Sequence, residues 1–433
     1  MMLVSSMVRK VILTFVAASF LAVGPLPHNA DATVGSPCKK LGQTRQVVLN
    51  KVKTTLTCTK VGNRTRWSTA ASRPSEATVY EPGAEKFVKM AQLVKDWEAQ
   101  CMYVIRDGAV LAEWNFGQHK RETNLEGASV TKSFASTLIG IASRKGLLSI
   151  DEPASKYITE WSTTGNRAIT IRHLLAMTSG LVEWTPPASS SWYGVGDVRQ
   201  AVIAAKLTML GPNLDGSYRE QVPGLFWRYH NVNTAALELV LSRATGQSVQ
   251  SFAARELFDP LEMSVDVMTD SKNIPSLAVG FRVGCDDLAK LIQLYLNGGS
   301  WKGSQILSSD YVRDATSRQI TCGKCETFGW GASRMNGAYG LQWWLNAAAP
   351  SACAPLDPAC DLRTSSGPTM PDLPVDMFYA SGACNQLGAG IPSLKVVVVV
   401  LRRGCESPAE ASLYWNNREP AYVFFRELAA AIR

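Results

Sequence analysis

Histidine is scarce in this chain of 433 residues, which contains His28, His119, His173 and His230. Residues 127–131 read G-A-S-V-T, so the G-x-S-x-G turn that carries the nucleophile of many Ser-His-Asp hydrolases is not present there. His173 lies in a run where Thr170 is expected to cap a helix that stops at Gly180, and we interpret this histidine as structural. The sequence therefore argues against a serine nucleophile that depends on histidine.

Long apolar runs are missing after the N-terminus. Residues 1–32 have the pattern of an export signal, with Arg9 and Lys10, an apolar stretch over 11–23 and a small-x-small cleavage site at 30–32. Retention as an anchor would need about 20 apolar residues, and glycine and prolines interrupt this run. No cysteine follows the cleavage site directly, so a lipid anchor is not expected. We predict a secreted or cell-wall/periplasmic protein with no transmembrane anchor after signal cleavage.

Acidic residues are missing from residues 33–75, which hold nine lysines and arginines. Within this stretch, residues 33–67 alternate short β-prone runs with glycine turns, which predicts a small basic β-hairpin module. Attachment to an anionic cell-wall polymer through residues 33–73 and a merely solvated hairpin both fit this composition. Nucleic acid is not an expected partner of an exported chain. Residues 68–82 resemble a linker in composition, and 83–433 form the main domain.

The ten cysteines, an even number, indicate an oxidising compartment. Closeness in the sequence suggests three disulfides: Cys38 with Cys58, Cys353 with Cys360, and Cys384 with Cys405. The pair Cys322-Gly-Lys-Cys325 has neither a histidine cluster nor a second C-x-x-C beside it, so we expect a structural disulfide there rather than a metal or redox site. Pairing within the motif and pairing with another cysteine both stay open. No cofactor or metal is expected.

One stretch carries the chemistry, GASVTKSFASTLIG at 127–140. Ser129 and Lys132 are three residues apart at the start of an apolar helical pattern, so they share one helical face. A serine hydroxyl becomes nucleophilic when a base takes its proton, and a lysine can be that base if burial or positive potential lowers its pKa. Free N–H groups at a helix start supply that potential. The motif predicts an activated serine.

Other segments frame this motif. Residues 85–100 have helical periodicity, and residues 101–114 read as a β-hairpin around Asp107-Gly108. Tyr229 and Asn231 precede the helical run 234–245 and can face one cavity. A phenol near the lysine amine would be useful for proton transfer.

Four segments together resemble a known superfamily: SVTKS at 129–133, ITIRHLLAMTSGL at 169–181, the run from Pro223 to Asn231 with its following helix, and YGLQWW at 339–344. In this order they resemble the beta-lactamase-related serine hydrolases. Within that group the chain is similar to class C beta-lactamases and family VIII esterases, and most similar to 6-aminohexanoate-dimer hydrolase-like amidases. The likeness extends from about residue 85 to the C-terminus.

The resemblance implies that Ser129 is acylated, Lys132 is the base and Tyr229 shares proton transfer, with Asn231 as a hydrogen-bond donor in the pocket. It implies an α/β (α+β) fold of beta-lactamase/transpeptidase type, an antiparallel sheet flanked by helices. A mostly helical insertion is expected over about 151–307. The hairpin and the runs 339–345, 377–383 and 395–402 are expected to supply strands.

The third motif of the superfamily, K-T-G or H-x-G, is replaced by Ala380-Ser381-Gly382. The resemblance implies an oxyanion hole from the N–H groups of Ser129 and Ala383, with Gly382 allowing close approach. The cation that contacts a substrate carboxylate is missing, unless Arg402 or Lys395 replaces it.

We therefore expect a secreted serine hydrolase that cleaves a small amide or ester. Two alternatives stay open, a beta-lactamase or D,D-peptidase acting at the cell wall, and a non-catalytic penicillin- or wall-binding protein.

Overall fold

A computed structural model describes residues 44–49, 52–61, 64–69, 76–181, 197–207, 209–210, 219–220, 222–224, 226–319, 324–325, 338–347, 368, 370–404 and 419–433. The chain forms two compact units, Met1–Ser72 and Arg73–Arg433. In the first unit, β1 (Thr44–Leu49), β2 (Val52–Val61) and β3 (Arg64–Thr69) form an antiparallel sheet in the order β1-β2-β3. The expected hairpin thus has a third strand.

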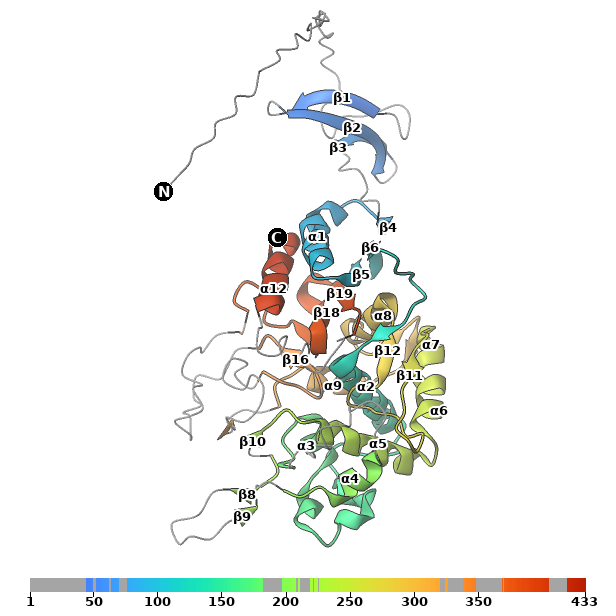
Figure 1. The fold of residues 1–433 in the computed structure, drawn as a ribbon, viewed down its shortest axis with the longest axis vertical. Helices are drawn as coiled ribbons and strands as arrows, with labels where there is room; N and C mark the ends of the chain where they lie inside the picture. Colours follow the sequence, from blue (N-terminus) through green and yellow to red (C-terminus); the bar gives the residue numbers. More distant parts are fainter. Residues whose placement is uncertain are drawn as a thin grey trace, which may run out of the picture. The chain divides into compact units, whose positions relative to one another are not determined.

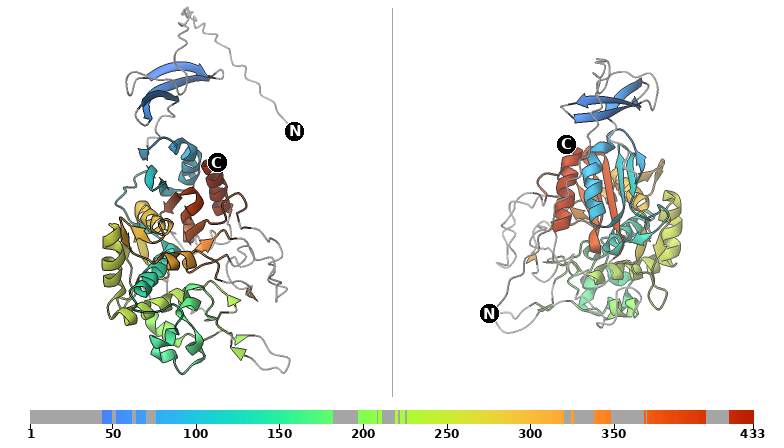
Figure 2. Two further views of the ribbon diagram at one scale, coloured as in Figure 1. Left: turned by 180° about the vertical axis from the view of Figure 1, so that it is seen from behind. Right: turned by 45° about the horizontal axis from the view of Figure 1, so that its top comes forward.

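The second unit is built on a seven-stranded antiparallel sheet with the order β16-β17-β18-β19-β5-β6-β4. Its strands are β4 (Ala77–Tyr80), β5 (Ala99–Arg106), β6 (Ala109–Asn115), β16 (Trp344–Leu345), β17 (Phe378–Gly382), β18 (Gln386–Ile391) and β19 (Val396–Arg402). Helices cover the sheet on both faces (Figures 1 and 2). This confirms the expected antiparallel sheet flanked by helices.

The burial of strand β19 explains why its sequence is apolar from Val396 to Leu401. Val397, Val399 and Leu401 belong to one core, shared with α2 (Thr131–Arg144) and α8 (Cys285–Leu296). The alternate residues Val396, Val398 and Val400 belong to a second core, shared with α1 (Val88–Asp96) and α12 (Glu419–Ile432). Side chains alternate between the faces of a sheet, so a strand that packs against a core on each face is apolar at successive positions.

The remaining helices lie mostly at one end of the sheet (Figure 1). They are α3 (Ile171–Leu175), α4 (Val198–Ala204), α5 (Asn231–Thr245), α6 (Val249–Ala253), α7 (Asp259–Leu261) and α9 (Ser309–Ala315), with a π-helical turn at Ala254–Phe258. A small sheet joins β11 (Asp266–Val267), β12 (Phe281–Val283) and β7 (Leu125–Glu126) in that order. The strand β7 of this small sheet lies directly before the Ser129 turn in the chain.

Three short strand pairs lie outside these two sheets. They are β8 (Met209–Leu210) with β9 (Arg219–Glu220), β10 (Phe226–Trp227) with β15 (Lys324–Cys325), and β13 (Ser300–Trp301) with β14 (Ser304–Gln305).

Several boundaries differ from the sequence expectations. Residues 77–80, assigned to a linker, pair with β6 as an edge strand. The helix expected over 85–100 ends at Asp96 because Ala99 opens β5, and the helix expected to reach Gly180 ends at Leu175. Of the run 339–345, only Trp344–Leu345 joins the sheet. The helix α8 falls inside the expected insertion but packs on β5, β18 and β19.

A disulfide joins Cys101 in β5 to Cys285, the first residue of α8, and the sequence spacing did not predict it. Cys384 is also disulfide-bonded. Its expected partner Cys405 lies outside the described residues, as do Cys38, Cys353, Cys360 and Cys322, and the side chains of Cys58 and Cys325 are not described. Among the helices of the described segments, none has both the length and the apolar character that a bilayer crossing needs.

Candidate active site

Ser129 lies in a short 3₁₀ turn, Ala128–Val130, that leads directly into α2. Its side chain is at the edge of the core, with the residue 7% exposed. The preceding residue, Ala128, has a φ of 45°, a left-handed conformation that is unusual for a residue with a side chain. The nucleophile candidate is therefore held at a sharp turn rather than inside a regular helix.

Lys132 lies one turn further on and is 1% exposed. Three oxygen atoms surround its Nζ: Ser129 Oγ at 2.9 Å, Asn231 Oδ1 at 2.7 Å and the Ala278 carbonyl at 2.8 Å. Ala278 was missed by sequence reasoning, because a backbone carbonyl leaves no mark in the side-chain pattern. The structure thus brings Ser129 and Lys132 together with Asn231, which lies 99 positions from Lys132 in the chain.

This arrangement suits a base. Burial disfavours the charged ammonium form of a lysine. A neutral amine has two N–H groups and one lone pair, so it can donate to Asn231 Oδ1 and Ala278 O while the lone pair faces the Ser129 hydroxyl. The two fixed acceptors hold the nitrogen 2.9 Å from Ser129 Oγ, within reach for proton transfer.

Tyr229 comes from the segment just before α5, and its ring centroid lies 5.0 Å from Lys132 Nζ. Trp344 stacks on this ring at 5.1 Å, and Tyr339 meets it edge-on at 6.1 Å. Trp227 completes the aromatic cluster at 6.3 Å from Tyr229. Burial, and then the neighbouring Tyr229, raise the pKa of Tyr339 well above 10, so its phenol stays neutral. The cluster fixes the Tyr229 ring against the amine.

Asn231 is the first residue of α5, which begins three residues earlier than the sequence predicted. It accepts from Lys132, whereas we expected it to act as a hydrogen-bond donor toward the pocket. Its amide nitrogen is a separate group that can still donate.

Gly382 ends β17 next to the Ser129 turn. A side chain at this position would place its Cβ 3.2 Å from Ser129 N and in collision with the Gly127 carbonyl. Glycine therefore allows the backbone leading into Ala383 to pass close to Ser129 N. Two residues earlier, Ala380 is 1% exposed and packs into the core that contains α2.

The two replacements considered for the missing cation lie elsewhere. Arg402 donates to the Trp97 carbonyl and pairs with Glu98 at 2.6 Å. Lys395 is exposed in the turn between β18 and β19. That turn is at the opposite end of β18 from Gln386, which pairs with Gly382, so about 16 Å of strand separates it from the site. Neither residue replaces the cation.

The histidines have other surroundings. His173 Nδ1 accepts from Thr170 N at 3.2 Å in a capping box at the start of α3, and burial lowers its pKa. Burial, and then Arg228, lower the pKa of His230 to about 4. Within the described ranges, no three His, Cys, Asp or Glu side chains gather as a metal site.

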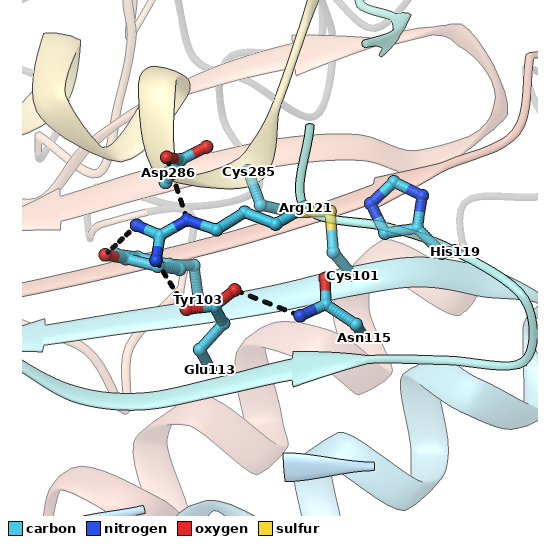
Figure 3. Close-up of a pocket in the computed structure, with 8 residues that line it drawn as sticks. All are labelled: Cys101, Tyr103, Glu113, Asn115, His119, Arg121, Cys285 and Asp286. Carbon is cyan, nitrogen blue, oxygen red and sulfur yellow. Dashed lines mark hydrogen bonds and ion pairs between the residues drawn. A yellow bond between two sulfur atoms is a disulfide. The ribbon is translucent and has the colours of Figure 1, made fainter. Parts of the chain in front are cut away.

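His119 lines a small pocket beside the Cys101–Cys285 disulfide (Figure 3). There Arg121 lies between Glu113, at 3.3 Å, and Asp286, at 3.2 Å. Burial is the main cause that raises the pKa of Tyr103, another wall of this pocket, to about 12. The charges in this pocket are therefore paired with one another, and the pocket does not include Ser129 or Lys132.

Comparison with known proteins identifies the family of the chain. The beta-lactamase family model matches residues 94–419. The chain is 23% identical over 300 residues to the 6-aminohexanoate-dimer hydrolase of Paenarthrobacter ureafaciens, covering 64% of this chain and 73% of that protein.

Solved structures show the same fold. A family VIII carboxylesterase has a TM-score of 0.55 at 15% identity, covering 81% of this chain and 100% of that one. A penicillin-binding protein homologue from Caulobacter crescentus has a TM-score of 0.54 at 15% identity, with the same coverage. The family match extends over most of the chain and contains every residue of the site described above. The chain belongs to the beta-lactamase family of serine hydrolases.

Proposed function

We propose that the protein hydrolyses a small amide or ester through an acyl intermediate on Ser129. The observation that carries this proposal is the 2.9 Å contact between Ser129 Oγ and the buried Lys132 Nζ. A hydroxyl and an amine at this distance, with the amine held by two further oxygens, form an activated nucleophile.

In the proposed first step, neutral Lys132 takes the hydroxyl proton while Ser129 Oγ attacks the substrate carbonyl carbon. The resulting oxyanion receives hydrogen bonds from the N–H groups of Ser129 and Ala383, which Gly382 lets approach one another. The carbon–nitrogen or carbon–oxygen bond to the leaving group then breaks, and the leaving group takes up a proton. In the second step water attacks the acyl carbon, the bond from this carbon to Ser129 Oγ breaks, and the carboxylic acid product leaves while Ser129 takes back a proton.

Tyr229 is proposed to carry the proton between the amine and the leaving group. Its ring lies beside Lys132 Nζ, and the aromatic cluster holds it there. In the second step the same side chain would help to activate water.

The proposed substrate lacks a carboxylate beside the scissile bond. A methyl group, that of Ala380, occupies the place of the superfamily's cation, and Arg402 is engaged by Glu98. A hydrogen bond to a charged group contributes about 1.5 to 3 kcal/mol, so its absence lowers affinity for carboxylate substrates about tenfold or more. Small linear amides and esters are favoured over beta-lactams.

The N-terminal segments extend the proposal to location. Residues 1–32 have the pattern of an export signal, and residues 33–75 carry nine basic and no acidic residues. We propose that the protein is exported and that residues 33–73 attach it to an anionic wall polymer. Deleting residues 33–73 is expected to release the protein from cell-wall fractions, and unchanged retention would contradict this attachment.

The test of function uses the mature protein and its Ser129→Ala variant. Both are treated with a fluorophosphonate, a labelled penicillin, nitrophenyl esters of varied chain length and a linear aminohexanoate dimer. We expect fluorophosphonate labelling and ester or amide turnover in the wild type, and neither in the variant. Labelling that survives Ser129→Ala would show that another residue is the nucleophile.

The same assay separates the alternatives. Faster turnover of penicillin than of neutral amides and esters would favour a beta-lactamase or D,D-peptidase. A stable penicillin adduct without turnover of any substrate would favour a non-catalytic binding protein. Lys132→Ala is expected to lower turnover by at least about 10²-fold.

A further inference from the structure

The turn that carries Ser129 is strained, and the strain has a specific support. Ala128 has a φ of 45° and is 3% exposed. A non-glycine residue in this region is energetically unfavourable, so it persists only where surrounding groups fix it. The groups in contact with this turn therefore show what holds the nucleophile in place.

Thr131 provides one side of this support. Its Oγ1 donates a hydrogen bond to the Ala128 carbonyl at 2.7 Å and accepts one from the Phe281 N–H at 3.0 Å. The side chain is 0% exposed. A hydroxyl combines one donor with acceptor lone pairs, so it can link these two backbone groups, whereas an apolar side chain of the same shape cannot.

Phe281 and Gly382 enclose the same turn from other directions. The Phe281 carbonyl accepts from Gly127 N at 2.9 Å, so both backbone groups of this residue in β12 are bound to the turn or to Thr131. Gly382 approaches so closely that a Cβ there would collide with the Gly127 carbonyl. The turn is thus held between β12 and β17, and Thr131 is the side chain that connects it to β12.

The orientation of one peptide group gives this contact a chemical consequence. The Ala128 carbonyl and the Ser129 N–H belong to the same peptide bond, which is planar and trans, so they point in opposite directions. A hydrogen bond that fixes the carbonyl also fixes the direction of the N–H.

We propose that Thr131 is a positioning residue that orients the Ser129 N–H for oxyanion binding through its hydrogen bond to the Ala128 carbonyl. This inference rests on the proposed acyl transfer at Ser129. Thr131 does not touch the substrate or the amine of Lys132 in this role. Its effect is on the transition state, because the oxyanion exists there and not in the bound substrate.

The test compares Thr131→Val, Thr131→Ser and the matched control Thr137→Val. Thr137 is also 0% exposed, and its hydroxyl also makes two hydrogen bonds, to the Ser133 carbonyl at 2.8 Å and with Tyr295 at 3.1 Å. It lies six residues later in the same helix. Both valine variants leave a buried carbonyl without its hydroxyl partner, so both are expected to lower stability.

The expected results separate positioning from stability. At a temperature where all variants are folded, Thr131→Val should lower kcat about 10²-fold, the scale of losing one oxyanion donor, with KM changed less than about threefold. Affinity for a boronic acid transition-state analogue should fall by a similar factor, and the midpoint of the pH–rate profile should stay in place. Thr131→Ser should restore kcat, and Thr137→Val should keep it.

An unchanged kcat in Thr131→Val, or an equal loss in Thr137→Val, would overturn the inference. So would a shifted pH midpoint, since that would indicate an effect on Lys132 instead. If Thr131→Val does not fold, Thr131→Cys decides, because a thiol is only a weak donor and acceptor. Its kcat should fall below that of Thr131→Ser, and a kcat equal to that of the wild type would contradict the role.

Failure of this inference and failure of the proposed function give different results. Full activity in Ser129→Ala would refute acyl transfer at Ser129, whatever Thr131→Val does. An inactive Ser129→Ala together with a fully active Thr131→Val would refute only the positioning role.

Discussion

Asn231 Oδ1 lies 2.7 Å from Lys132 Nζ, so a neutral amide is a direct partner of the buried amine. Its position at the first residue of α5 brings it to α2 from a distant part of the chain. A carboxylate at this place would stabilise the ammonium form strongly, whereas an amide oxygen orients the nitrogen without adding a negative charge. The choice of asparagine is thus consistent with a lysine that must lose its proton to act.

Asn231→Asp is expected to lower the activity because it adds a negative charge, since the two side chains have nearly the same shape. An opposite charge at this distance raises the pKa of an ammonium by about 1 to 3 units. The rise of kcat/KM with pH should shift to higher pH by that amount. At pH values below this rise, kcat/KM should therefore be about 10 to 10³-fold lower than in the wild type. The measurement is a pH–rate profile with a nitrophenyl ester.

Asn233→Asp is the matched control for this substitution. Asn233 is two residues further along α5, where it binds Ser179 rather than Lys132. Its variant should keep the wild-type midpoint, and a rising limb that stays in place in Asn231→Asp would show that Lys132 is not the titrating base.

Tyr229→Phe tests the phenol while keeping the ring. The variant preserves the stacking on Trp344 at 5.1 Å, so the free energy of unfolding should change by less than about 1 kcal/mol. Turnover should fall by at least about 10²-fold, because the variant lacks the phenol that is proposed to transfer the proton. Steady-state kinetics and urea denaturation provide the two readouts.

Tyr339→Phe removes a hydroxyl from the same aromatic cluster, 6.1 Å from Tyr229 between ring centroids. Its kcat should stay within about threefold of the wild type. Equal losses in the two variants would mean that the cluster, and not the Tyr229 phenol, sets the rate.

The parts of the site that the sequence could predict are local or carried by side chains. Ser129 and Lys132 are three residues apart, so helical geometry alone places them together. Tyr229 and Asn231 needed the resemblance to a superfamily, because nothing in their own spacing indicates a contact with residue 132. The Ala278 carbonyl was out of reach, since any residue type could supply it.

The strands of the fold were predictable from continuous apolar runs, but not where glycine residues interrupt the apolar sequence of a strand. The strand β19 is a continuous valine run, but β18 reads QLGAGI and was not expected. Gly388 and Gly390 lie under α8, where added Cβ atoms would come within 2.7 and 2.6 Å of its side chains. Glycine lowers β propensity, yet here it lets a helix pack closely on the sheet. The Cys101–Cys285 pairing spans 184 residues, so closeness in sequence could not suggest it.

That disulfide is expected to stabilise the second unit substantially. Closing a loop over a separation of 184 residues contributes about 5 kcal/mol in the chain-entropy model, and measured values of 2 to 5 kcal/mol are typical. The double variant Cys101→Ala/Cys285→Ala should lose stability on that scale in urea denaturation. A loss below about 1 kcal/mol would contradict the expectation.

The low pKa of His230 predicts a loss of stability in acid. Burial and Arg228 lower this pKa from 6.5 to about 4, so the folded state keeps the imidazole neutral while the unfolded state binds a proton below pH 6.5. The stabilisation is complete above pH 6.5 and is lost as the pH falls toward 4. Between pH 7.5 and pH 5 this group alone should remove about 2 kcal/mol from the free energy of unfolding. His230→Asn should therefore lose about 2 kcal/mol less than the wild type over the same pH interval in urea denaturation, since His119, His173 and the carboxylates titrate in both proteins. Equal losses of unfolding free energy in the wild type and in His230→Asn would show that His230 is protonated as readily in the folded state as in the unfolded one.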